Sequence, residues 1–569
     1  MVAALGVSAH YHDAAAALVI DGEIVAAVQE ERLSGRKHDP SFPRRAIAEC
    51  LALGNLEGPD LDCAVFYENP YAKLERVLVS ALRTFPRSYR QFPRAMAQQL
   101  SEKIWVLDRI SEATGIDRRK VETVHHHHSH AAAAFFTAPY REAAVLTVDG
   151  VGEETTTAIW HGQNDVLEER LAVAFPHSLG LFYAALTAYL GFEVNEGEYK
   201  VMGLAAYGTD RFAEEFSTLL RLFDDGSFEL NLPFFDSFAD PTRAYGTKLT
   251  ELLGPARRPG RAWDLEDPAD QRYADIARSL QTRLEDAVVG LAKRARSLTQ
   301  ASALCLAGGV ALNAVANRRV LQEAGFDRMY VQPAAGDAGG ALGAAIAGAI
   351  AHGDPLPAAL ASPDLGLPAA AARTKGLAEE LGLDVRTVSD PIFEANASIE
   401  RGDIVGLCTG RGEWGPRARG FRSLLADPTT IDTRERINRR VKGREPFRPF
   451  APATIADEAA AYYTGAPNDL TRFMTTVCEV TERGKAVAAA TTHVDGSARV
   501  QTTTENSAPV LHAILEARHR AGLPPVLLNT SLNGPGEPIA ADGPAALATF
   551  LSRPFDALLV EDVMIRRKR

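Results

Sequence analysis

The sequence predicts an α/β protein with a duplicated first domain and a separate second domain. Residues 3–28 and residues 143–171 follow the same plan of strand, turn, strand, turn and strand. Repetition of one supersecondary plan indicates a duplicated domain. Residues 354–374 combine prolines with Ala, Gly and Asp, which is typical of a linker. We therefore expect a first domain at 1–353 and a second domain at 375–569.

Length and composition fit a multidomain globular enzyme. The chain has 569 residues, too many for one compact core, with 46% hydrophobic and 24% charged residues. Its net charge of -12 argues against binding to nucleic acid or to an anionic membrane. The five cysteines form no C-x-x-C pair, which favours reduced thiols. No leader or membrane-spanning segment is recognisable, so we expect a cytoplasmic protein.

The first strand, near residues 3–7, runs into a polar turn that contains His12 and Asp13. A carboxylate next to an imidazole can orient it and raise its basicity. His12 is therefore a candidate general base, with a simple polar turn residue as the alternative. The later Asp21-Gly22 pair is a strong hairpin signal.

A histidine run precedes the second copy. Histidines occupy positions 125–128 and 130 at the start of an Ala-rich, helical stretch. Residues four apart share a helix face, so His126 and His130 can converge on one transition metal. The strand 143–148 then ends at Asp149, which offers a third ligand. The alternative is a polar helix start with solvated histidines.

Two further turns between strand and helix contain glycines. Gly308 and Gly309 follow a buried strand at 302–306, and Asp337 follows another strand at 329–332. Glycines let the backbone approach a ligand closely and aim the helix N-terminus at a phosphate. These turns would bring a fourth metal ligand and the phosphates of a nucleotide to one crevice.

Cations are concentrated in the second domain. Residues 411–422 contain four arginines between glycines, and residues 442–448 add three more cations. Such enrichment in an acidic protein favours an anionic ligand, because guanidinium groups match phosphate or carboxylate oxygens. A solvated basic surface is the alternative. The chain lacks both the G-x-x-x-x-G-K-[ST] phosphate loop and the G-x-S-x-G nucleophile elbow.

Taken together, these motifs resemble the O-carbamoyltransferases of the nodulation-factor and antibiotic-tailoring type, such as the cephamycin and tobramycin enzymes. Two departures are Arg419, where a leucine is expected, and His128, which replaces an apolar residue. Arg419 is expected to alter the anion pocket. The motifs are Tyr11-His12-Asp13-Ala14-Ala15, Glu30-Glu31-Arg32, His126-His127-x-x-His130-Ala131, Val148-Asp149-Gly150, Lys200-Val201-Met202-Gly203-Leu204-Ala205-Ala206-Tyr207-Gly208, Gly308-Gly309-Val310-Ala311-Leu312-Asn313, Gly336-Asp337, Glu413-Trp414-Gly415-Pro416-Arg417-Ala418, Lys442-x-Arg444-Glu445-x-x-Arg448-Pro449-Phe450 and Asn529-Thr530-Ser531-x-Asn533.

The resemblance implies an actin-like (ASKHA, Kae1-like) first domain and a YrdC-like second domain. It implies that the second domain makes carbamoyl-adenylate from ATP and carbamoyl phosphate. The first domain would then transfer the carbamoyl group to a hydroxyl of a natural-product acceptor. Iron(II) is the expected metal, with zinc or manganese as alternatives, and Mg²⁺ could accompany ATP.

The resemblance also assigns residues to roles. His12 and Asp13 are the candidate catalytic pair. The expected metal ligands are His126, His130, Asp149 and Asp337. The expected nucleotide-binding residues are Gly150, Gly308, Gly309, Asn313 and Asn529. Arg417, Lys442, Arg448 and Arg499 are expected to hold carbamoyl phosphate and ATP.

Rival functions are a threonylcarbamoyl-type tRNA-modifying enzyme, an actin-like kinase and a catalytically silent binding scaffold. The net charge and the second domain count against the first two, and the number of polar motifs counts against the third. The expected partner is a small-molecule acceptor, and a homodimer is left open. Aromatic residues within 66–118 and 222–268 suggest a bulky, partly apolar acceptor, although core packing explains them equally well.

Overall fold

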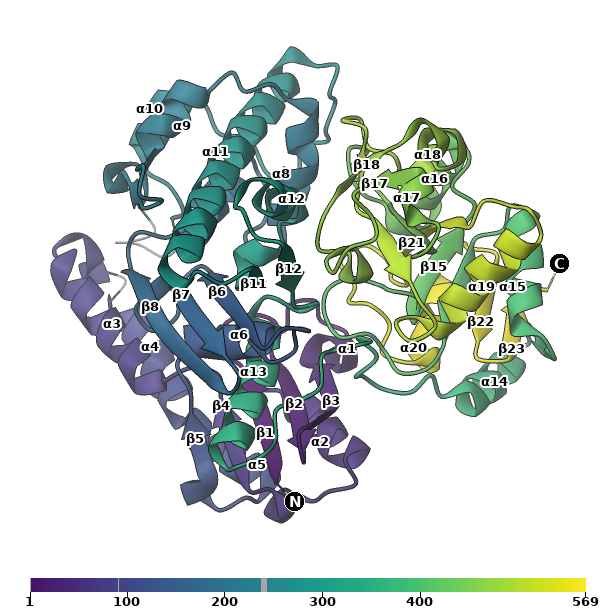
Figure 1. Ribbon diagram of the computed structural model, residues 1–569, viewed down its shortest axis with the longest axis horizontal. Coiled ribbons are helices and arrows are strands. Elements are labelled where there is room, and N and C mark those ends of the chain that lie inside the picture. The colour runs from purple at the N-terminus through teal and green to yellow at the C-terminus, as the bar shows by residue number, and fades with distance from the viewer. Residues whose placement is uncertain (1, 91, 237–242, 569) are drawn as a thin grey trace. The chain divides into compact units, whose positions relative to one another are not determined.

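The computed structural model describes residues 2–90, 92–236 and 243–568, which form two compact units (Figure 1). The first unit is Met1–Ala26 with Pro40–Ala359, and the second is Ala27–Asp39 with Leu360–Arg569. The segment Ala27–Asp39 groups with the second unit although it lies early in the chain. Within that unit the Ala27 N–H donates to the Leu365 carbonyl at 3.0 Å, and Arg32 Nη2 donates to the Gly415 carbonyl at 2.7 Å.

Each half of the first unit contains a five-stranded sheet. The first sheet has the order β3-β2-β1-β4-β5, and the second has the order β12-β11-β6-β7-β8. In the first sheet, β1 is antiparallel to β2 and parallel to β4. In the second sheet, β6 is likewise antiparallel to β7 and parallel to β11. The strands are β1 (Ala3–Ser8), β2 (Ala15–Ile20), β3 (Glu23–Gln29), β4 (Cys63–Phe66), β5 (Val121–Thr123), β6 (Glu142–Val148), β7 (Thr155–Gln163), β8 (Val166–Ala174), β11 (Ala303–Ala307) and β12 (Arg328–Val331).

When only its own five strands are numbered in chain order, each sheet has the order 3-2-1-4-5. The predicted α/β class and the duplicated, actin-like plan of the first unit are therefore confirmed. The central strands are mostly apolar because both of their faces are covered. Every residue of β1 is buried, as are all residues of β6 after Glu142.

Two helices rich in small residues fill the space between the sheets. Helix α13 (Asp337–Ala351) packs on β1, β2 and β4, helix α6 (His126–Phe135) packs on β6, β7 and β11, and the two helices pack on each other (Figure 1). Glycines permit this close approach. A Cβ at Gly343 would lie 1.8 Å from the Ser129 carbonyl oxygen, and one at Gly6 would lie 1.9 Å from the Ala341 carbonyl oxygen.

The remaining helices and a short hairpin of the first unit cover the outer faces of this core or extend from it. The longest, α11 (Pro268–Thr299), starts at the N-cap Asp267 and buries residues along most of its length. The others are α2 (Arg44–Leu53), α3 (Pro70–Arg83), α4 (Phe92–Ser101), α5 (Val106–Thr114), α7 (Leu179–Tyr189), α8 (Glu198–Leu204), α9 (Ala213–Leu219), α10 (Thr247–Leu253) and α12 (Ala314–Glu323), with the hairpin β9 (Leu220–Leu222) and β10 (Phe228–Leu230).

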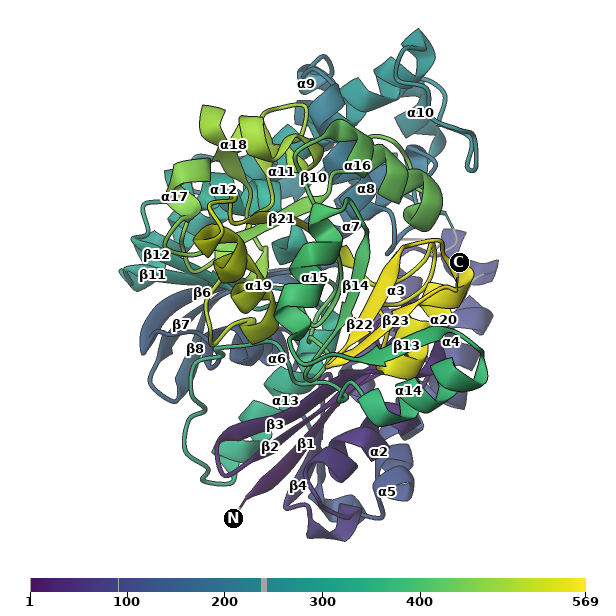
Figure 2. The ribbon, with the colours of Figure 1, turned by 90° about the vertical axis from the view of Figure 1, so that its right-hand side faces the viewer.

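The second unit is built on an eight-stranded sheet with helices on both faces (Figure 2). Helices α14 (Ala371–Glu380) and α20 (Gly543–Ser552) supply one core, and α15 (Pro391–Glu400) and α19 (Pro509–Arg520) supply the other. The sheet order is β13 (Asp384–Thr387), β23 (Val563–Arg566), β22 (Ala557–Val560), β14 (Val405–Cys408), β15 (Arg422–Ala426), β21 (Val526–Ser531), β16 (Ala451–Ile455) and β20 (Gln501–Thr503).

A smaller sheet completes the second unit. It contains β17 (Tyr463–Thr464), β18 (Cys478–Val480) and β19 (Ser497–Ala498). Four short helices belong to this unit, namely α1 (Glu30–Ser34), α16 (Ile431–Ile437), α17 (Ala459–Tyr462) and α18 (Glu482–Val487). Across the described ranges of the chain, no helix combines the length and the apolar character needed to cross a membrane.

The contact between α6 and α13 leads to a stability prediction. We expect Gly343→Ala to lower the free energy of unfolding by about 1–3 kcal/mol, because the new Cβ would overlap the Ser129 carbonyl. This overlap should exceed the gain of about 1 kcal/mol in helix propensity. Calorimetric melting of the purified variant would measure the change.

The matched control is Gly376→Ala in α14, where a Cβ meets no heavy atom within 4 Å. That variant should melt at or above the temperature of the unsubstituted protein. A Gly343→Ala protein that melts as high as the Gly376→Ala protein would contradict the tight packing of α6 against α13.

Candidate functional site

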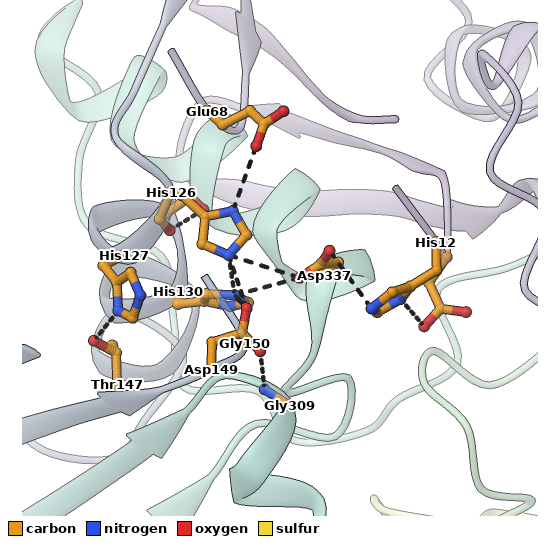
Figure 3. A network of polar contacts seen from close by, with 12 residues as sticks. His12, Glu68, His126, His127, His130, Thr147, Asp149, Gly150, Gly309 and Asp337 are labelled. Atoms are coloured by element: carbon orange, nitrogen blue, oxygen red, sulfur yellow. Dashed lines mark hydrogen bonds and ion pairs between the residues drawn. The ribbon is translucent and has the colours of Figure 1, made fainter. Parts of the chain in front are cut away.

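Four predicted metal ligands converge in the first unit (Figure 3). His126 and His130 project from the first turns of α6, Asp149 follows β6, and Asp337 is the first residue of α13. One ligand atom from each residue lies within 4.8 Å of the other three. The spacing of four residues on α6 therefore places both imidazoles on one face, as the sequence predicts.

The ligand atoms crowd around one point. His126 Nε2 lies 2.9 Å from Asp149 Oδ2 and 3.1 Å from His130 Nε2. Asp337 Oδ1 lies 3.7 Å from His126 Nε2 and 3.6 Å from His130 Nε2. Burial lowers the pKa of His130, but the carboxylates of Asp149 and Asp337 outweigh burial and raise it to about 9.

Asp337 provides the test of whether a metal fits. Its side chain is 1% exposed, and neither carboxylate oxygen has a hydrogen-bond partner among the described residues. A buried carboxylate that accepts no hydrogen bond is costly unless a cation offsets its charge. Two imidazoles and two carboxylates are a ligand set that divalent iron, zinc and manganese accept. The residues present therefore fit a transition metal ion.

Two glutamates that the sequence analysis did not single out support the histidine helix. The carboxylate of Glu153 accepts the His126 N–H at 3.1 Å and the Asn69 N–H at 2.6 Å. It thus caps the N-terminus of α6, which its own N-cap His125 does not do. Glu68 Oε2 lies 4.0 Å from His126 Nδ1, on the side of the ring away from the ligand cluster (Figure 3).

The other histidines of the run face elsewhere. His127 Nδ1 pairs with Thr147 Oγ1 at 2.8 Å, and burial holds the pKa of His127 well below its usual value. The side chain of His125 is 72% exposed. The ring of His128 lies 5.6 Å from that of Trp160. The ligand cluster therefore includes none of these three residues.

His12 lies at the edge of the cluster. Its Nδ1 contacts Asp13 Oδ2 at 2.9 Å, and its Nε2 lies 3.9 Å from Asp337 Oδ2 (Figure 3). Burial lowers the pKa of His12, but the charges of Asp337 and Asp13 outweigh burial and raise it to about 10. A cation bound to Asp337 would offset the charge that contributes most to this rise.

The predicted nucleotide-binding glycines surround Asp149. The Gly309 N–H donates to Asp149 Oδ1 at 2.9 Å. Gly308 has a φ of 88°, and a Cβ there would lie 2.3 Å from the Val148 carbonyl oxygen, so only glycine fits. The Gly150 carbonyl accepts the Ser178 hydroxyl at 2.6 Å. Backbone groups thus lie close to the ligand cluster.

The Asn313 side chain is fixed by neighbours. Its Oδ1 caps α12 by accepting the Ala316 N–H at 3.1 Å, and its Nδ2 donates to Gln281 Oε1 at 2.9 Å. Gln281 Nε2 in turn donates to Asn313 Oδ1 at 3.0 Å and to Glu285 Oε1 at 2.8 Å. Gln281 therefore orients Asn313, a role that no local sequence pattern indicates.

In the second unit the predicted cations converge on Arg499. Burial and the positive charges of Arg417, Arg444, Arg419 and Arg448 hold the pKa of Arg499 well below its usual value. Its Nε atom is buried and has no hydrogen-bond partner among the described residues. Apart from the buried Arg419, these arginines are partly exposed, and a group of cations that repel one another favours an anionic ligand.

Lys442 also belongs to the predicted cations, but its ammonium is hydrogen-bonded to the loop at Ser531 and Asn533. Its ammonium donates to Asn533 Oδ1 at 2.7 Å, to the Asn533 carbonyl at 3.0 Å and to the Ser531 carbonyl and hydroxyl. Burial, followed by the charges of Arg444 and Arg448, keeps the pKa of Lys442 well below its usual value. In this structure Lys442 therefore fixes the turn after β21.

Asn529 lies in this second unit, whereas the predicted nucleotide-binding glycines lie in the first. Its Nδ2 donates to Gln501 Oε1 at 2.7 Å and to the Ala418 carbonyl at 3.3 Å. Arg419, one of the two sequence departures, is 1% exposed and donates to the carbonyls of Trp414 and Phe473. Glu413 Oε1 accepts the backbone N–H groups of residues 419, 421 and 422. These contacts shape the loop that presents Arg417.

Two family models match the chain. The model described as carbamoyltransferase N-terminus matches residues 3–346, and the model described as carbamoyltransferase C-terminus matches residues 396–567. Together they include every predicted site residue.

Similar known proteins come from several bacteria. A protein of Synechocystis, uncharacterized protein sll1178, is 38% identical over 99% of this chain and 96% of its own length. Nodulation protein NolNO of Sinorhizobium fredii is 34% identical over 98% of this chain and 79% of its own length. The 3'-hydroxymethylcephem-O-carbamoyltransferase of Amycolatopsis lactamdurans is 32% identical over 46% of this chain and 48% of its own length.

The ligand cluster predicts how substitutions affect metal binding. We expect His130→Ala and Asp337→Asn each to weaken Fe(II) binding by more than the roughly 10- to 100-fold typical of a lost outer-shell partner, because each removes a direct ligand. Competition titration against a chelator would measure the affinity, and elemental analysis would give the stoichiometry. His125→Ala is the matched control, since that side chain is exposed. Full metal affinity in the His130→Ala protein would show that the cluster is not the metal site.

Proposed function

The chain belongs to the carbamoyltransferase family, and from this premise we propose that it is an ATP-dependent O-carbamoyltransferase. The proposed acceptor is a natural product with a free hydroxyl group. This proposal agrees with the relative named as a cephem O-carbamoyltransferase. The proposed division of labour assigns activation of the carbamoyl group to the second, YrdC-like unit and its transfer to the first unit.

The proposed first reaction makes a better leaving group. Water releases carbamate and phosphate from carbamoyl phosphate, and a carbamate oxygen then attacks the α-phosphorus of ATP. The bond to pyrophosphate breaks, and carbamoyl-adenylate forms. Carbamate alone is a poor electrophile, whereas its anhydride with AMP carries a stable leaving group.

The cations around Arg499 support this assignment. Arg417, Arg448 and Arg499 would hold phosphate and triphosphate oxygens and stabilise the charge that develops as pyrophosphate leaves. Lys442 would act on the same ligands through its charge and through the turn at Ser531 and Asn533. Mg²⁺ bound to ATP would be compatible with this arrangement.

The proposed second reaction is transfer in the first unit. His12 would accept the proton of the acceptor hydroxyl, whose oxygen attacks the carbamoyl carbon while the bond to AMP breaks. Asp13 would hold His12 through Nδ1, which leaves Nε2 to take the proton. The tight turn at Gly308 and Gly309 would let the AMP phosphate approach the backbone closely. A metal ion held by His126, His130, Asp149 and Asp337 would supply positive charge that polarises the anhydride.

The convergence of four candidate ligands carries this proposal, because one of them, the buried carboxylate of Asp337, lies 3.9 Å from the candidate base. Neither a kinase reaction nor a silent scaffold accounts for the second unit and its group of cations around Arg499. Iron(II) is the proposed metal, with zinc and manganese as alternatives that metal analysis would separate.

The test is to incubate the full, metal-loaded chain with ATP and carbamoyl phosphate. We expect pyrophosphate and carbamoyl-adenylate, detected by coupled assay and mass spectrometry, and no product when carbamoyl phosphate is omitted. Formation of ADP instead of AMP and pyrophosphate would indicate a kinase. A folded, metal-loaded protein without ATP-dependent turnover would overturn the proposal.

Substitution of His12 separates the two reactions. We expect His12→Asn to reduce carbamoyl transfer by at least about 100-fold, the usual contribution of a positioned acid or base, while carbamoyl-adenylate still forms. Screening of hydroxyl acceptors for carbamate product would provide the transfer assay. Loss of both reactions, or of neither, would remove His12 from the proposed role of base.

A further inference from the structure

Three cations lie beside the loop that carries His12. Lys73 and Arg76 belong to α3, and Lys103 begins a short 3-10 helix, Lys103–Trp105. Lys73 is 7% exposed, and its ammonium lies 5.7 Å from the ring centroid of Tyr11. The Tyr11 ring lies 4.5 Å from the ring of His12. Through Lys73 and Tyr11, this cation cluster, defined as Lys73, Arg76 and Lys103, is linked to the candidate base. Arg76 lies three residues after Lys73 on the same helix, and both residues repel the charge of Lys103.

The positive charges of the cation cluster are not matched by carboxylates in ion-pair contact. Glu68 forms an ion pair with Lys73, and Glu102 is an exposed residue whose ion-pair partners are His10 and Arg109. Among residues 2–90, 92–236 and 243–568, no carboxylate lies within 4.0 Å of Arg76 or Lys103. Arg76 Nε is buried and unpaired within the same described ranges. The buried carboxylates that act on the cluster are Glu68, which is paired with Lys73, and Glu153, which raises the pKa of Arg76 without an ion pair within 4.0 Å.

Desolvation and mutual repulsion act on this cluster. Burial, with added repulsion from Lys73 and Arg76, lowers the pKa of Lys103 to about 8. Burial also lowers the pKa of Arg76, while Glu68 raises it. Cations that are partly desolvated without matching carboxylates are costly to keep together, and a bound anion would offset that cost.

The proposed reactions use none of these three residues. Phosphates in the first unit would meet the turn at Gly308 and Gly309, and the metal would be held by His126, His130, Asp149 and Asp337. The Arg76 guanidinium also lies 5.5 Å from the centroid of the Phe175 ring. That ring is uncharged, so the positive charge of the cluster is not neutralised by it.

We propose that Arg76 and Lys103, with Lys73 anchored by Glu68, form a subsite for an anionic group of the acceptor. The acceptor class is then a hydroxyl compound that carries a carboxylate, phosphate or sulfate group. This inference rests on the proposed function, because it places the anion next to the base that would activate the hydroxyl. It adds a charged group to the bulky, partly apolar acceptor that the sequence suggests, and this group would fix the orientation of the acceptor.

Anion binding can be tested without the natural acceptor. The amine of Lys103 reacts with acetic anhydride at mildly alkaline pH, and peptide mass spectrometry follows the rate of labelling. We expect inorganic sulfate to slow acetylation of Lys103 by at least about fivefold, because an anion stabilises the protonated, unreactive amine. The exposed Lys248 serves as the internal reference and should show no protection.

Variants show whether the subsite causes the protection. Arg76→Gln should abolish the effect of sulfate on Lys103. Arg83→Gln, an exposed arginine at the end of the same helix, should leave the protection unchanged. Equal labelling of Lys103 with and without sulfate would overturn the subsite, as would protection that survives Arg76→Gln.

Acceptor selectivity provides the second test. Matched pairs of a hydroxy acid and its methyl ester are compared by kcat/KM for carbamate formation in the full, metal-loaded chain. We expect a preference of at least about tenfold for the acid, the value of one charge-assisted hydrogen bond, and loss of the preference in Arg76→Gln. Arg83→Gln should keep the preference.

The outcomes of these experiments distinguish failure of the proposed carbamoyltransferase function from failure of the proposed anionic acceptor. If the unsubstituted protein releases no pyrophosphate from ATP and carbamoyl phosphate, the proposed function fails. If pyrophosphate forms but acids and esters react equally, the anionic acceptor fails while the proposed function stands. If Arg76→Gln slows acids and esters to the same extent, the cluster holds the phosphate of the carbamoyl donor, and the acceptor proposal is overturned.

Discussion

The burial of Asp337 without a hydrogen-bond partner is the constraint on which the first unit depends. Desolvation of an ionised carboxylate costs several kcal/mol, and the groups that lie within 4.0 Å of this one to offset it are the Nε2 atoms of His12, His126 and His130. The imidazoles of His126 and His130 also face each other at 3.1 Å, a distance that suits ligands of a shared cation. A cation bound between these residues would offset the desolvation of Asp337, so binding of a metal would stabilise this part of the fold.

The duplicated fold explains how the groups meet. In each half, the turn between the first two strands is aimed at the middle of the unit: one turn carries His12 and the other carries Asp149. The helices between the sheets supply the rest, with His126 and His130 on α6 and Asp337 at the start of α13. Small residues matter here because larger ones would separate α6 from α13 and pull the ligands apart.

Local sequence signals predicted the duplicated fold and the convergence of four polar residues because both depend on short-range periodicity. Strand plans, the four-residue histidine spacing and glycines at strand ends can be read within a few positions. Glu153 and Gln281 could not be found this way, since they act on His126 and Asn313 across a tertiary contact. The charge imbalance around Arg76 was also hidden, because it depends on which carboxylates lie nearby in space.

The grouping of Ala27–Asp39 with the second unit has a consequence for the history of the chain. The backbone passes between the units at three places, 26/27, 39/40 and 359/360. A gene fragment that encodes residues 360–569 would lack helix α1 and its contact with Gly415. Recombination that exchanges one unit for a relative's unit by a single crossover would therefore produce a mismatched hybrid, which favours inheritance of the two units as one piece.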